Sequence, residues 1–308
     1  MTINEILEKY SGDTSTEYTK LGIFPFDILK MFVPGSFIQF VGETNTGKTI
    51  IALHIALKFC QQGKKVLYID ADNAITSERL ESVSLSQYTQ SSFFLLKLNA
   101  FTEVEEAIDA FIEDNTSLII VDSLPCLINE NYLKISGKRK ISINNNNSNY
   151  DSRPLGLFFK KYKVLAAKNK TSFVLINNFR TNIVMPIGTV LKRYGPKCVD
   201  YSCSTIIELC NIPKKHKFGD FQKGFPAFAG KLLGMKVVKN SHGASEIILP
   251  IPLNYANGII DSTYAIYFHK KRHLVDDSEL KEFKKAAFEN QELFDKMAKF
   301  YLSEGGDV

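Results

Sequence analysis

The chain has 308 residues, a net charge of +5 and a hydrophobic content of 44%. These values predict one large folded domain with small appendages and argue against intrinsic disorder. No apolar run is long enough to span a membrane, and residues 1–10 lack the apolar centre of a signal peptide. The five cysteines form no C-x-x-C pair, so we expect a cytoplasmic protein with reduced thiols and no structural zinc.

The positive charge is concentrated in the middle of the chain. Residues 134–197 contain fourteen Lys or Arg and a single acidic residue, Asp151, which gives this segment a net charge of +13. The remaining residues therefore carry a net charge of −8. This polarised distribution favours nucleic acid as a partner, although some lysines of 160–170 are also typical of a solvated helix face.

Strand and helix patterns alternate along the chain. We expect strands at 37–41, 64–73, 93–100, 117–128, 171–178, 204–209, 231–240, 246–253 and 264–272, and helices at 1–10, 50–59, 76–83, 102–115, 155–170 and 276–301. The alternation predicts an α/β fold with a mainly parallel twisted sheet between helices, and the final strands predict an antiparallel extension. The basic segments 129–154 and 179–197 are predicted to be irregular.

Three regions follow from this pattern. Residues 1–20 form an N-terminal arm, 21–273 form the core, and 274–308 form a helical tail. A helix of ten residues is marginally stable in isolation, so we expect the helix at 1–10 to dock on the core or on a neighbouring subunit.

Residues 42–49 read G-x-x-x-x-G-K-T, the signature of a phosphate-binding loop (P-loop). Its glycines let backbone N–H groups surround a polyphosphate, while Lys48 reaches the β and γ phosphates and the Thr49 hydroxyl binds Mg²⁺. An apolar strand precedes the loop and a helix follows it, so the anion lies at a helix N-terminus. The residues predicted to hold the nucleotide are Gly42, Glu43, Thr44, Asn45, Thr46, Gly47, Lys48, Thr49 and Ile50.

A second feature of the site is an acidic residue at the end of a buried strand. The apolar run 118–121 is followed by Asp122. A carboxylate at the end of a strand beside a P-loop can hold the water shell of Mg²⁺. A capping role is the alternative, but the presence of the P-loop favours Thr49 and Asp122 as metal ligands, partly through water.

Five motifs occur in a characteristic order between about residues 21 and 260. They are GETNTGKT, YIDADNAITSERL, LIIVDSLPCL, VLINNFR and MKVVKN. This series resembles the RecA family of strand-exchange ATPases. The compact N-terminus and the segment LPIPLNYANGIIDS are most similar to bacteriophage recombinases of the UvsX type. The resemblance implies a RecA-like P-loop ATPase core with ATP and Mg²⁺ as cofactors.

The resemblance also implies roles for single residues. Asp72 matches the catalytic glutamate that orients the attacking water, and Arg79 matches an arginine that stacks on adenine. Asn178 matches the switch residue that senses the γ-phosphate. Lys239 matches a lysine that reaches the phosphates of the neighbouring subunit. Simpler interpretations remain open: Asp72 as a solvated residue, Asn178 as a strand cap and Arg79 as an exposed helix residue.

The sequence departs from the family pattern at three positions. Asp72 and Asn178 are each one carbon shorter than the family's Glu and Gln, and a second interfacial lysine of bacterial RecA is replaced by Ser241. General-base catalysis is sensitive to displacements of about 1 Å. We therefore expect either slow hydrolysis or a site whose walls have moved inward.

The two basic segments fall where the family has its DNA-binding loops. The residues predicted to contact DNA are Lys134, Lys138, Arg139, Lys140, Arg153, Arg180, Lys192, Arg193 and Lys197. The partners that the resemblance implies are single-stranded and double-stranded DNA, further copies of the chain in a helical filament, and possible mediator and single-strand-binding proteins. Backbone contacts carry no base code, so little sequence preference is expected.

The expected function is therefore an ATP-dependent homologous recombinase that forms filaments on single-stranded DNA in recombination and repair. A recombination mediator with weak or no hydrolysis is the first alternative, which the shortened Asp72 and Asn178 favour. A hexameric helicase motor of the DnaB type is the second. It shares the P-loop but has an arginine finger for which this sequence shows no clear counterpart.

Overall fold

The computed structural model describes residues 17–128, 149–184, 188–211, 230–254 and 258–259. The helix expected at 1–10, the strand at 264–272 and the tail at 274–308 lie outside these residues. So does most of the first basic segment, including Lys134, Lys138, Arg139 and Lys140.

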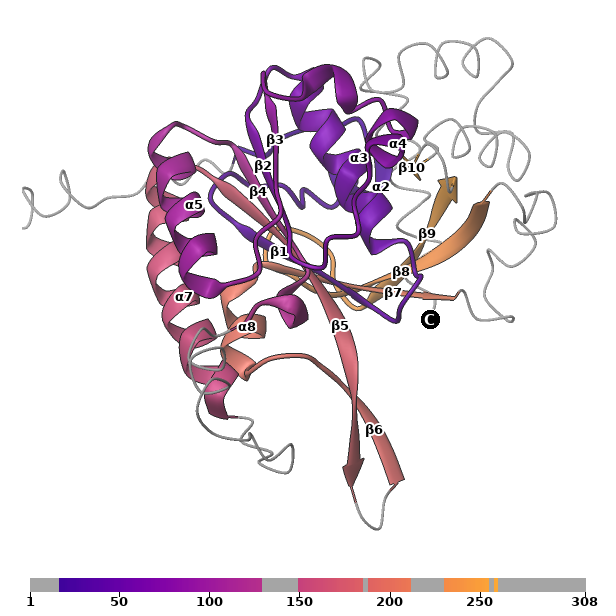
Figure 1. The fold of residues 1–308 in the computed structure, drawn as a ribbon. Coiled ribbons are helices and arrows are strands. Elements are labelled where there is room, and N and C mark those ends of the chain that lie inside the picture. Colours follow the sequence, from indigo (N-terminus) through magenta and orange to yellow (C-terminus); the bar gives the residue numbers. More distant parts are fainter. Residues whose placement is uncertain (1–16, 129–148, 185–187, 212–229, 255–257, 260–308) are drawn as a thin grey trace, which may run out of the picture.

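A large twisted sheet forms the centre of the described structure (Figure 1). Its strand order is β10-β9-β8-β7-β1-β5-β4-β2-β3, and β6 pairs with β5. The strands are β1 (Phe37–Gly42), β2 (Val66–Asp70), β3 (Phe93–Leu96), β4 (Leu118–Asp122), β5 (Ser172–Val184), β6 (Gly188–Arg193), β7 (Thr205–Asn211), β8 (Gly230–Asn240), β9 (Ile247–Asn254) and β10 (Gly258–Ile259). Strands β7, β1, β5, β4, β2 and β3 are parallel, and β8, β9 and β10 continue antiparallel. The predicted fold class is confirmed.

Helices cover both faces of the sheet. On one face lie α2 (Phe24–Ile28), α3 (Lys48–Gln61) and α4 (Ser77–Ser82), and on the other lie α5 (Phe101–Glu113), α7 (Asn149–Asn169) and α8 (Lys197–Ser202). Short 3₁₀ turns occur at Ser86–Tyr88 and Leu124–Cys126. Side chains of β1 alternate between the two cores: Ile38 and Phe40 pack with α3, whereas Phe37 and Val41 pack with α7. Strand β1 is therefore buried on both sides, as a central parallel strand requires.

Helix α7 is longer than the sequence pattern predicts. It begins at Asn149 rather than near 155, so the end of the expected irregular segment is helical. Pro154 lies inside this helix, and a proline in a sequence normally indicates a helix boundary because it disfavours helical geometry in the preceding residue. This explains why the first turns were not expected.

Residues 179–184 and 188–193 pair as two antiparallel strands and α8 begins at Lys197, so the expectation of an irregular segment at 179–197 is corrected. Strand β5 continues to Val184 and pairs antiparallel with β6, from Phe179 opposite Arg193 to Val184 opposite Gly188. The sequences TNIV and TVL are rich in β-branched residues, which favour strands. Figure 1 shows the hairpin projecting away from the rest of the sheet.

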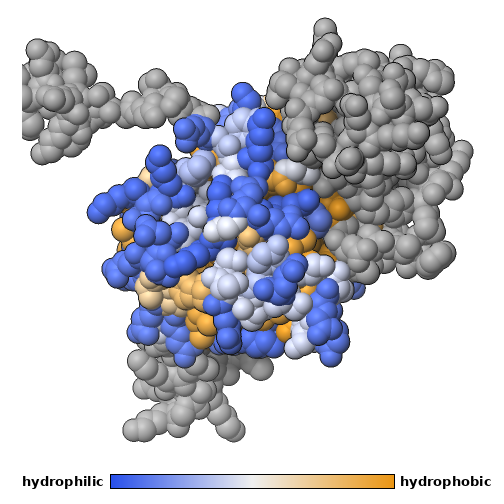
Figure 2. All heavy atoms as spheres, turned by 90° about the horizontal axis from the view of Figure 1, so that it is seen from above, coloured by the Kyte–Doolittle hydropathy of each residue, from blue (hydrophilic) through white to orange (hydrophobic). Residues whose placement is uncertain are grey.

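The surface agrees with a protein whose apolar side chains are mainly internal. Figure 2 shows a mainly hydrophilic face with smaller apolar patches between the hydrophilic residues. Within the described ranges, no helix combines the length and apolar character needed to cross a membrane. All five cysteines lie in the described part of the chain and are free thiols.

Candidate nucleotide-binding site

The P-loop connects the end of β1 to the start of α3. Gly47 adopts a left-handed conformation (φ 83°) directly before the helix. A Cβ atom on Gly47 would collide with the side chain of Leu253, and one on Gly42 would lie 2.5 Å from Oγ1 of Thr46. The loop therefore closes this tightly only with glycine at both positions.

The ammonium group of Lys48 lies inside the loop. Its Nζ donates hydrogen bonds to the backbone oxygens of Gly42 (2.9 Å) and Glu43 (2.7 Å), and the residue is almost completely buried. Thr46 Oγ1 donates to the same Glu43 oxygen (2.8 Å). These contacts hold a positive charge next to the N-terminus of α3, where a phosphate group is favoured.

A cavity of about 430 Å³ adjoins the loop. It is lined by Asn45, Thr46, Gly47, Lys48, Thr49, Ile50, Ala74 and Arg79. Arg79 comes from α4, whose N-terminus is capped by Thr76 Oγ1, which accepts a hydrogen bond from the Arg79 backbone N–H (3.3 Å). Glu43 and Thr44 are exposed on the same loop. The volume, the loop amides and the two cations fit a nucleoside triphosphate, with phosphates at Lys48 and a base near Arg79.

The predicted magnesium ligands, Thr49 and Asp122, contact each other, and Thr49 lines this cavity. Asp122 ends β4 in register with Asp70 at the end of β2, and its side chain is buried. Tyr68 donates a hydrogen bond to Asp122 Oδ2 (2.7 Å), and the Thr49 hydroxyl also hydrogen-bonds this carboxylate. Burial raises the pKa of Asp122, while the hydrogen bonds from Tyr68 and Thr49 oppose that shift.

The side-chain oxygens of Thr49 and Asp122 can hold Mg²⁺ only together with ligands from outside the protein. Within the described ranges, no three His, Cys, Asp or Glu side chains are arranged to hold a metal ion. Mg²⁺ commonly takes one or two protein oxygens and fills its shell with water and phosphate oxygens. Thr49 and Asp122 match that pattern.

Two further carboxylates adjoin Asp122. Asp70 is fully buried and accepts hydrogen bonds from the backbone N–H groups of Ala74 (3.1 Å) and Ile75 (3.0 Å). Asp72 lies on the turn that these bonds hold. Partial burial, a hydrogen bond with Asp70 and the nearby charges of Asp122 and Asp70 raise the pKa of Asp72 to about 6. A carboxylate in this range is suited to act as a general base near neutral pH.

Asn178 lies beside the start of the P-loop. It is in register with Gly42 on the neighbouring strand, and its backbone oxygen accepts a hydrogen bond from the Tyr194 N–H (2.9 Å). Its side-chain Oδ1 is buried without a hydrogen-bond partner in the described part of the chain. A buried polar atom without a partner is unusual and indicates a position where a ligand or water binds.

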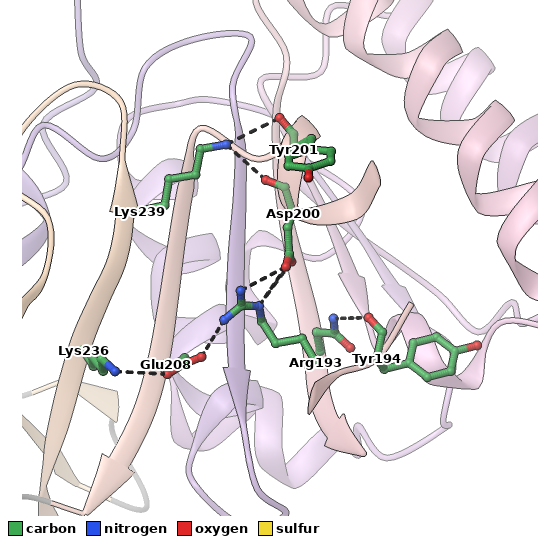
Figure 3. Close-up of polar contacts among 8 residues, drawn as sticks. Arg193, Tyr194, Asp200, Tyr201, Glu208, Lys236 and Lys239 are labelled. Atoms are coloured by element: carbon green, nitrogen blue, oxygen red, sulfur yellow. Dashed lines mark hydrogen bonds and ion pairs between the residues drawn. The ribbon is translucent and has the colours of Figure 1, made fainter. Parts of the chain in front are cut away.

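Lys239 lies away from this cluster. It pairs with Ile206 on β7, and its Nζ donates hydrogen bonds to the backbone oxygens of Asp200 (3.1 Å) and Tyr201 (3.5 Å) in α8 (Figure 3). It lines a different cavity, at the start of β1, whereas the P-loop follows the end of β1. Of the predicted nucleotide residues, only Lys239 is therefore remote from the site in its own chain.

Comparison with known proteins decides the family. A model of the RecA N-terminal domain matches residues 29–260. The chain belongs to the RecA family.

Sequence identity to individual members of the RecA family is low. The chain is 22% identical to Protein RecA of Lactobacillus acidophilus over 79% of its length and 62% of the relative's. It is 23% identical to Protein RecA of Rhodopirellula baltica over 73% of the chain and 56% of that relative. It thus spans less than two thirds of these bacterial relatives. DNA repair and recombination protein RadB of Methanococcus maripaludis is 26% identical over 66% of the chain and 88% of the relative.

The predicted DNA-contacting residues of this RecA-family chain fall into three groups. Arg153, Arg180, Lys192 and Lys197 are exposed. Arg180 and Lys192 face each other across the base of the β5–β6 hairpin. Lys134, Lys138, Arg139 and Lys140 lie outside the described residues. Arg193 forms the third group, because it contacts acidic residues of its own chain.

Arg193 forms ion pairs at the base of the hairpin (Figure 3). Its guanidinium donates to both carboxylate oxygens of Asp200 (3.0 to 3.2 Å) and to Oε1 of Glu208 (2.7 Å). Lys236 lies 4.0 Å from the other oxygen of Glu208. The side chain of Arg193 is 25% exposed. Its role as a DNA ligand stays a prediction, and the structure gives it a second role in joining β6, α8 and β7.

Substitutions can separate these two roles of Arg193. We expect Arg193→Gln and Asp200→Asn each to lower the free energy of unfolding by about 1 kcal/mol, with less than additive loss in the double variant, because both remove the same partly exposed pair. Chemical denaturation measures this, and Lys192→Gln is the exposed control. If only Arg193→Gln weakened DNA binding, and neither variant altered stability, the ion pairs would be unimportant.

Sequence reasoning missed Tyr68 and Asp70 as parts of the site. Both lie within an apolar strand pattern, and only the register of β2 with β4 reveals that they lie beside Asp122. Asp70 also hydrogen-bonds Asp72, two residues later in the chain. The strand-end motif Y-I-D-A-D contained a usable signal for Asp70, since two acids flank one alanine.

Tyr68→Phe tests the support that Asp122 receives. The substitution removes the Tyr68 hydroxyl and leaves the buried Asp122 carboxylate with one hydrogen-bond donor fewer. In the absence of Mg²⁺ we therefore expect the free energy of unfolding to fall by about 1 to 3 kcal/mol. Thermal unfolding with and without Mg²⁺ and nucleotide measures it. Tyr88→Phe, on a different part of the same face, serves as the control. Equal effects of the two variants would contradict a specific role for Tyr68.

Proposed function

We propose that this RecA-family chain is an ATP-dependent recombinase that forms helical filaments on single-stranded DNA and promotes strand exchange. One observation carries the proposal: a single strand, β5, passes from the nucleotide site to the basic hairpin. Asn178 is in register with Gly42 of the P-loop, and Arg180 follows two residues later at the hairpin base. A strand shared in this way can link the state of the γ-phosphate to the position of the hairpin.

Residues of the chain have distinct roles in ATP binding. Lys48 and the loop amides bind the phosphates, Arg79 stacks on the adenine, and Thr49 and Asp122 hold Mg²⁺. The metal ion, when bound, neutralises phosphate charge during phosphoryl transfer. The cavity that joins the P-loop to Arg79 supports this assignment.

Asp72 acts as general base toward the attacking water. Its raised pKa and its place beside Asp122 support that role. Asn178 contacts the γ-phosphate with its side-chain amide. After hydrolysis this contact with the γ-phosphate is lost. Strand β5 is then no longer held by the nucleotide, and the filament is weakened.

Successive subunits stack head to tail. The nucleotide cavity and Lys239 lie toward opposite ends of β1, which supports a contact between unlike surfaces of two copies. A contact of this kind that does not close produces a helical filament. The segment 1–10 is a candidate for further contact between subunits, and mediator and single-strand-binding proteins are candidate loading partners.

The basic hairpin and the segment 129–154 bind DNA mainly through phosphates. Exposed Arg180, Lys192 and Lys197 support a backbone contact, which carries little sequence preference and weakens steeply with salt. The similarity to RadB, a DNA repair and recombination protein, supports this role. The similarity to phage recombinases of the UvsX type stays a prediction.

A recombination mediator that hydrolyses ATP slowly is the second candidate, and the short side chain of Asp72 favours it.

Fluorescence anisotropy of labelled single-stranded DNA, measured with ATP, with ADP and without nucleotide, tests the recombinase proposal together with electron microscopy. ATP-dependent binding and helical filaments are expected. Binding indifferent to nucleotide would contradict the proposal, and closed rings would favour a helicase motor.

A further inference from the structure

A second polar cavity, of about 290 Å³, lies at the start of β1. We call it the basic pocket. Its walls come from the turn before β1, from α7, from the connection between α8 and β7, and from the end of β8. The residues used in the argument below are Ser36, Lys163, Cys203, Ser204, Lys239 and His242. Strand β1 has six residues, so the basic pocket lies about 17 Å from the P-loop.

Ser36 is the clearest sign of a missing ligand in the basic pocket. The residue is 9% exposed, and its Oγ has no hydrogen-bond partner in the described part of the chain. The preceding Gly35 (φ 82°) packs so closely on α7 that a Cβ would lie 2.9 Å from Ala167 Cα. This close contact fixes Ser36 relative to the helix that carries Lys163. A buried hydroxyl held in this way is suited to donate to a bound group.

The charges around the basic pocket favour an anion. Lys163 and Lys239 line it, and none of the other described residues that line it is a carboxylate. Burial and the negative charge of Asp200 raise the pKa of the Cys203 thiol, and Lys239, Arg193 and Lys163 oppose that shift, so both lysines act at this wall of the pocket. Burial lowers the pKa of His242, so this side chain contributes a neutral N–H donor rather than a third charge. Two cations with hydroxyl and imidazole donors are typical of a site for phosphate oxygens.

We propose that the basic pocket is a second oxyanion site that binds a phosphate group, and that Lys163 binds it together with Lys239. The phosphate could be part of the nucleotide bound by a neighbouring copy or could come from solution. The first source rests on the head-to-tail assembly proposed above, whereas the site itself does not. Lys163 is the new element, because it comes from α7 and is far from the P-loop of its own chain.

Binding of inorganic triphosphate to the full chain tests the site directly. The Lys48→Ala background removes the P-loop contribution, and isothermal titration at protein concentrations that keep the chain monomeric gives the affinity. We expect one saturable site, weakened about tenfold by Lys163→Ala and by Ser36→Ala. Lys163→Arg should restore binding. Lys168→Ala, an exposed lysine on the same helix, is the matched control and should have no effect.

Absence of saturable triphosphate binding, or equal affinities for the Lys163→Ala and Lys168→Ala variants, would overturn the proposal. A second experiment distinguishes the two sources of the phosphate. Light scattering measures the ATP-dependent assembly of chains that have an intact P-loop. If the neighbouring nucleotide fills the site, Lys163→Ala raises the ATP concentration needed for assembly about tenfold. If assembly is unchanged while triphosphate binding is lost, free phosphate is the ligand. A chain that never assembles refutes the recombinase but leaves the titration valid.

Discussion

Replacement of Lys48 by alanine will weaken ATP binding by at least about 100-fold and reduce hydrolysis to a background level. The buried Nζ of Lys48 lies between the backbone oxygens of Gly42 and Glu43, at the N-terminus of α3. Charge-assisted hydrogen bonds contribute about 1.5 to 3 kcal/mol each. Loss of the contacts to two phosphates should therefore weaken nucleotide binding by at least about 100-fold. A fluorescent ATP analogue measures the affinity, and phosphate release measures turnover.

The control for this prediction is Lys97→Ala, because Lys97 is an exposed lysine outside the cavity. Circular dichroism shows whether the Lys48 variant is folded, which matters because its ammonium group also supports the loop. A folded Lys48→Ala variant that bound ATP normally would place the nucleotide elsewhere in the molecule.

Replacement of Asp72 by asparagine will remove hydrolysis while leaving ATP binding intact. Asn cannot accept the proton of the attacking water, and general-base catalysis contributes on the order of 10² to 10⁴ in rate. Asp72 does not line the P-loop cavity, so the affinity should change by less than about twofold. Single-turnover hydrolysis and nucleotide titration measure the two quantities separately. Equal losses of affinity and rate would identify Asp72 as a binding residue instead.

The pH dependence of hydrolysis provides a second test of Asp72. Burial and the neighbouring carboxylates raise its pKa to about 6, and only the ionised form accepts a proton. The rate should therefore fall as the pH is lowered through about 6. Asp72→Glu extends the carboxylate by one carbon. A faster variant would show that Asp72 is too short, whereas a slower one would show that the site walls have closed around it.

Much of the fold follows from local sequence patterns. The run before Gly42, the G-x-x-x-x-G-K-T loop and the apolar helix after it predict β1, the P-loop and α3, because backbone geometry and phosphate chemistry restrict each of them strongly. The acid after the run 118–121 likewise predicts the end of β4. In such segments periodicity and local chemistry agree, so the prediction needs no knowledge of distant contacts.

Contacts between distant segments could not be predicted in this way. Tyr68 looks like one more apolar strand residue until the register of β2 and β4 places its hydroxyl on Asp122. Arg193 looks like a DNA ligand in a basic segment, and only the fold of the hairpin and α8 places it between Asp200 and Glu208. Pro154 concealed the start of α7, because tertiary packing overrode its local preference. In the hairpin the β-branched residues of TNIV and TVL do favour strands, but the pairing of β5 with β6 is not visible in the sequence pattern.

We propose that a single strand, β5, connects the nucleotide site to a DNA-binding hairpin. The most direct test is steady-state ATP hydrolysis by the purified chain with and without single-stranded DNA, using wild type and Arg180→Ala. We predict that DNA stimulates wild-type hydrolysis and that Arg180→Ala reduces the stimulation while leaving DNA-free turnover unchanged. Hydrolysis that proceeds at the same rate with and without DNA would contradict the connection.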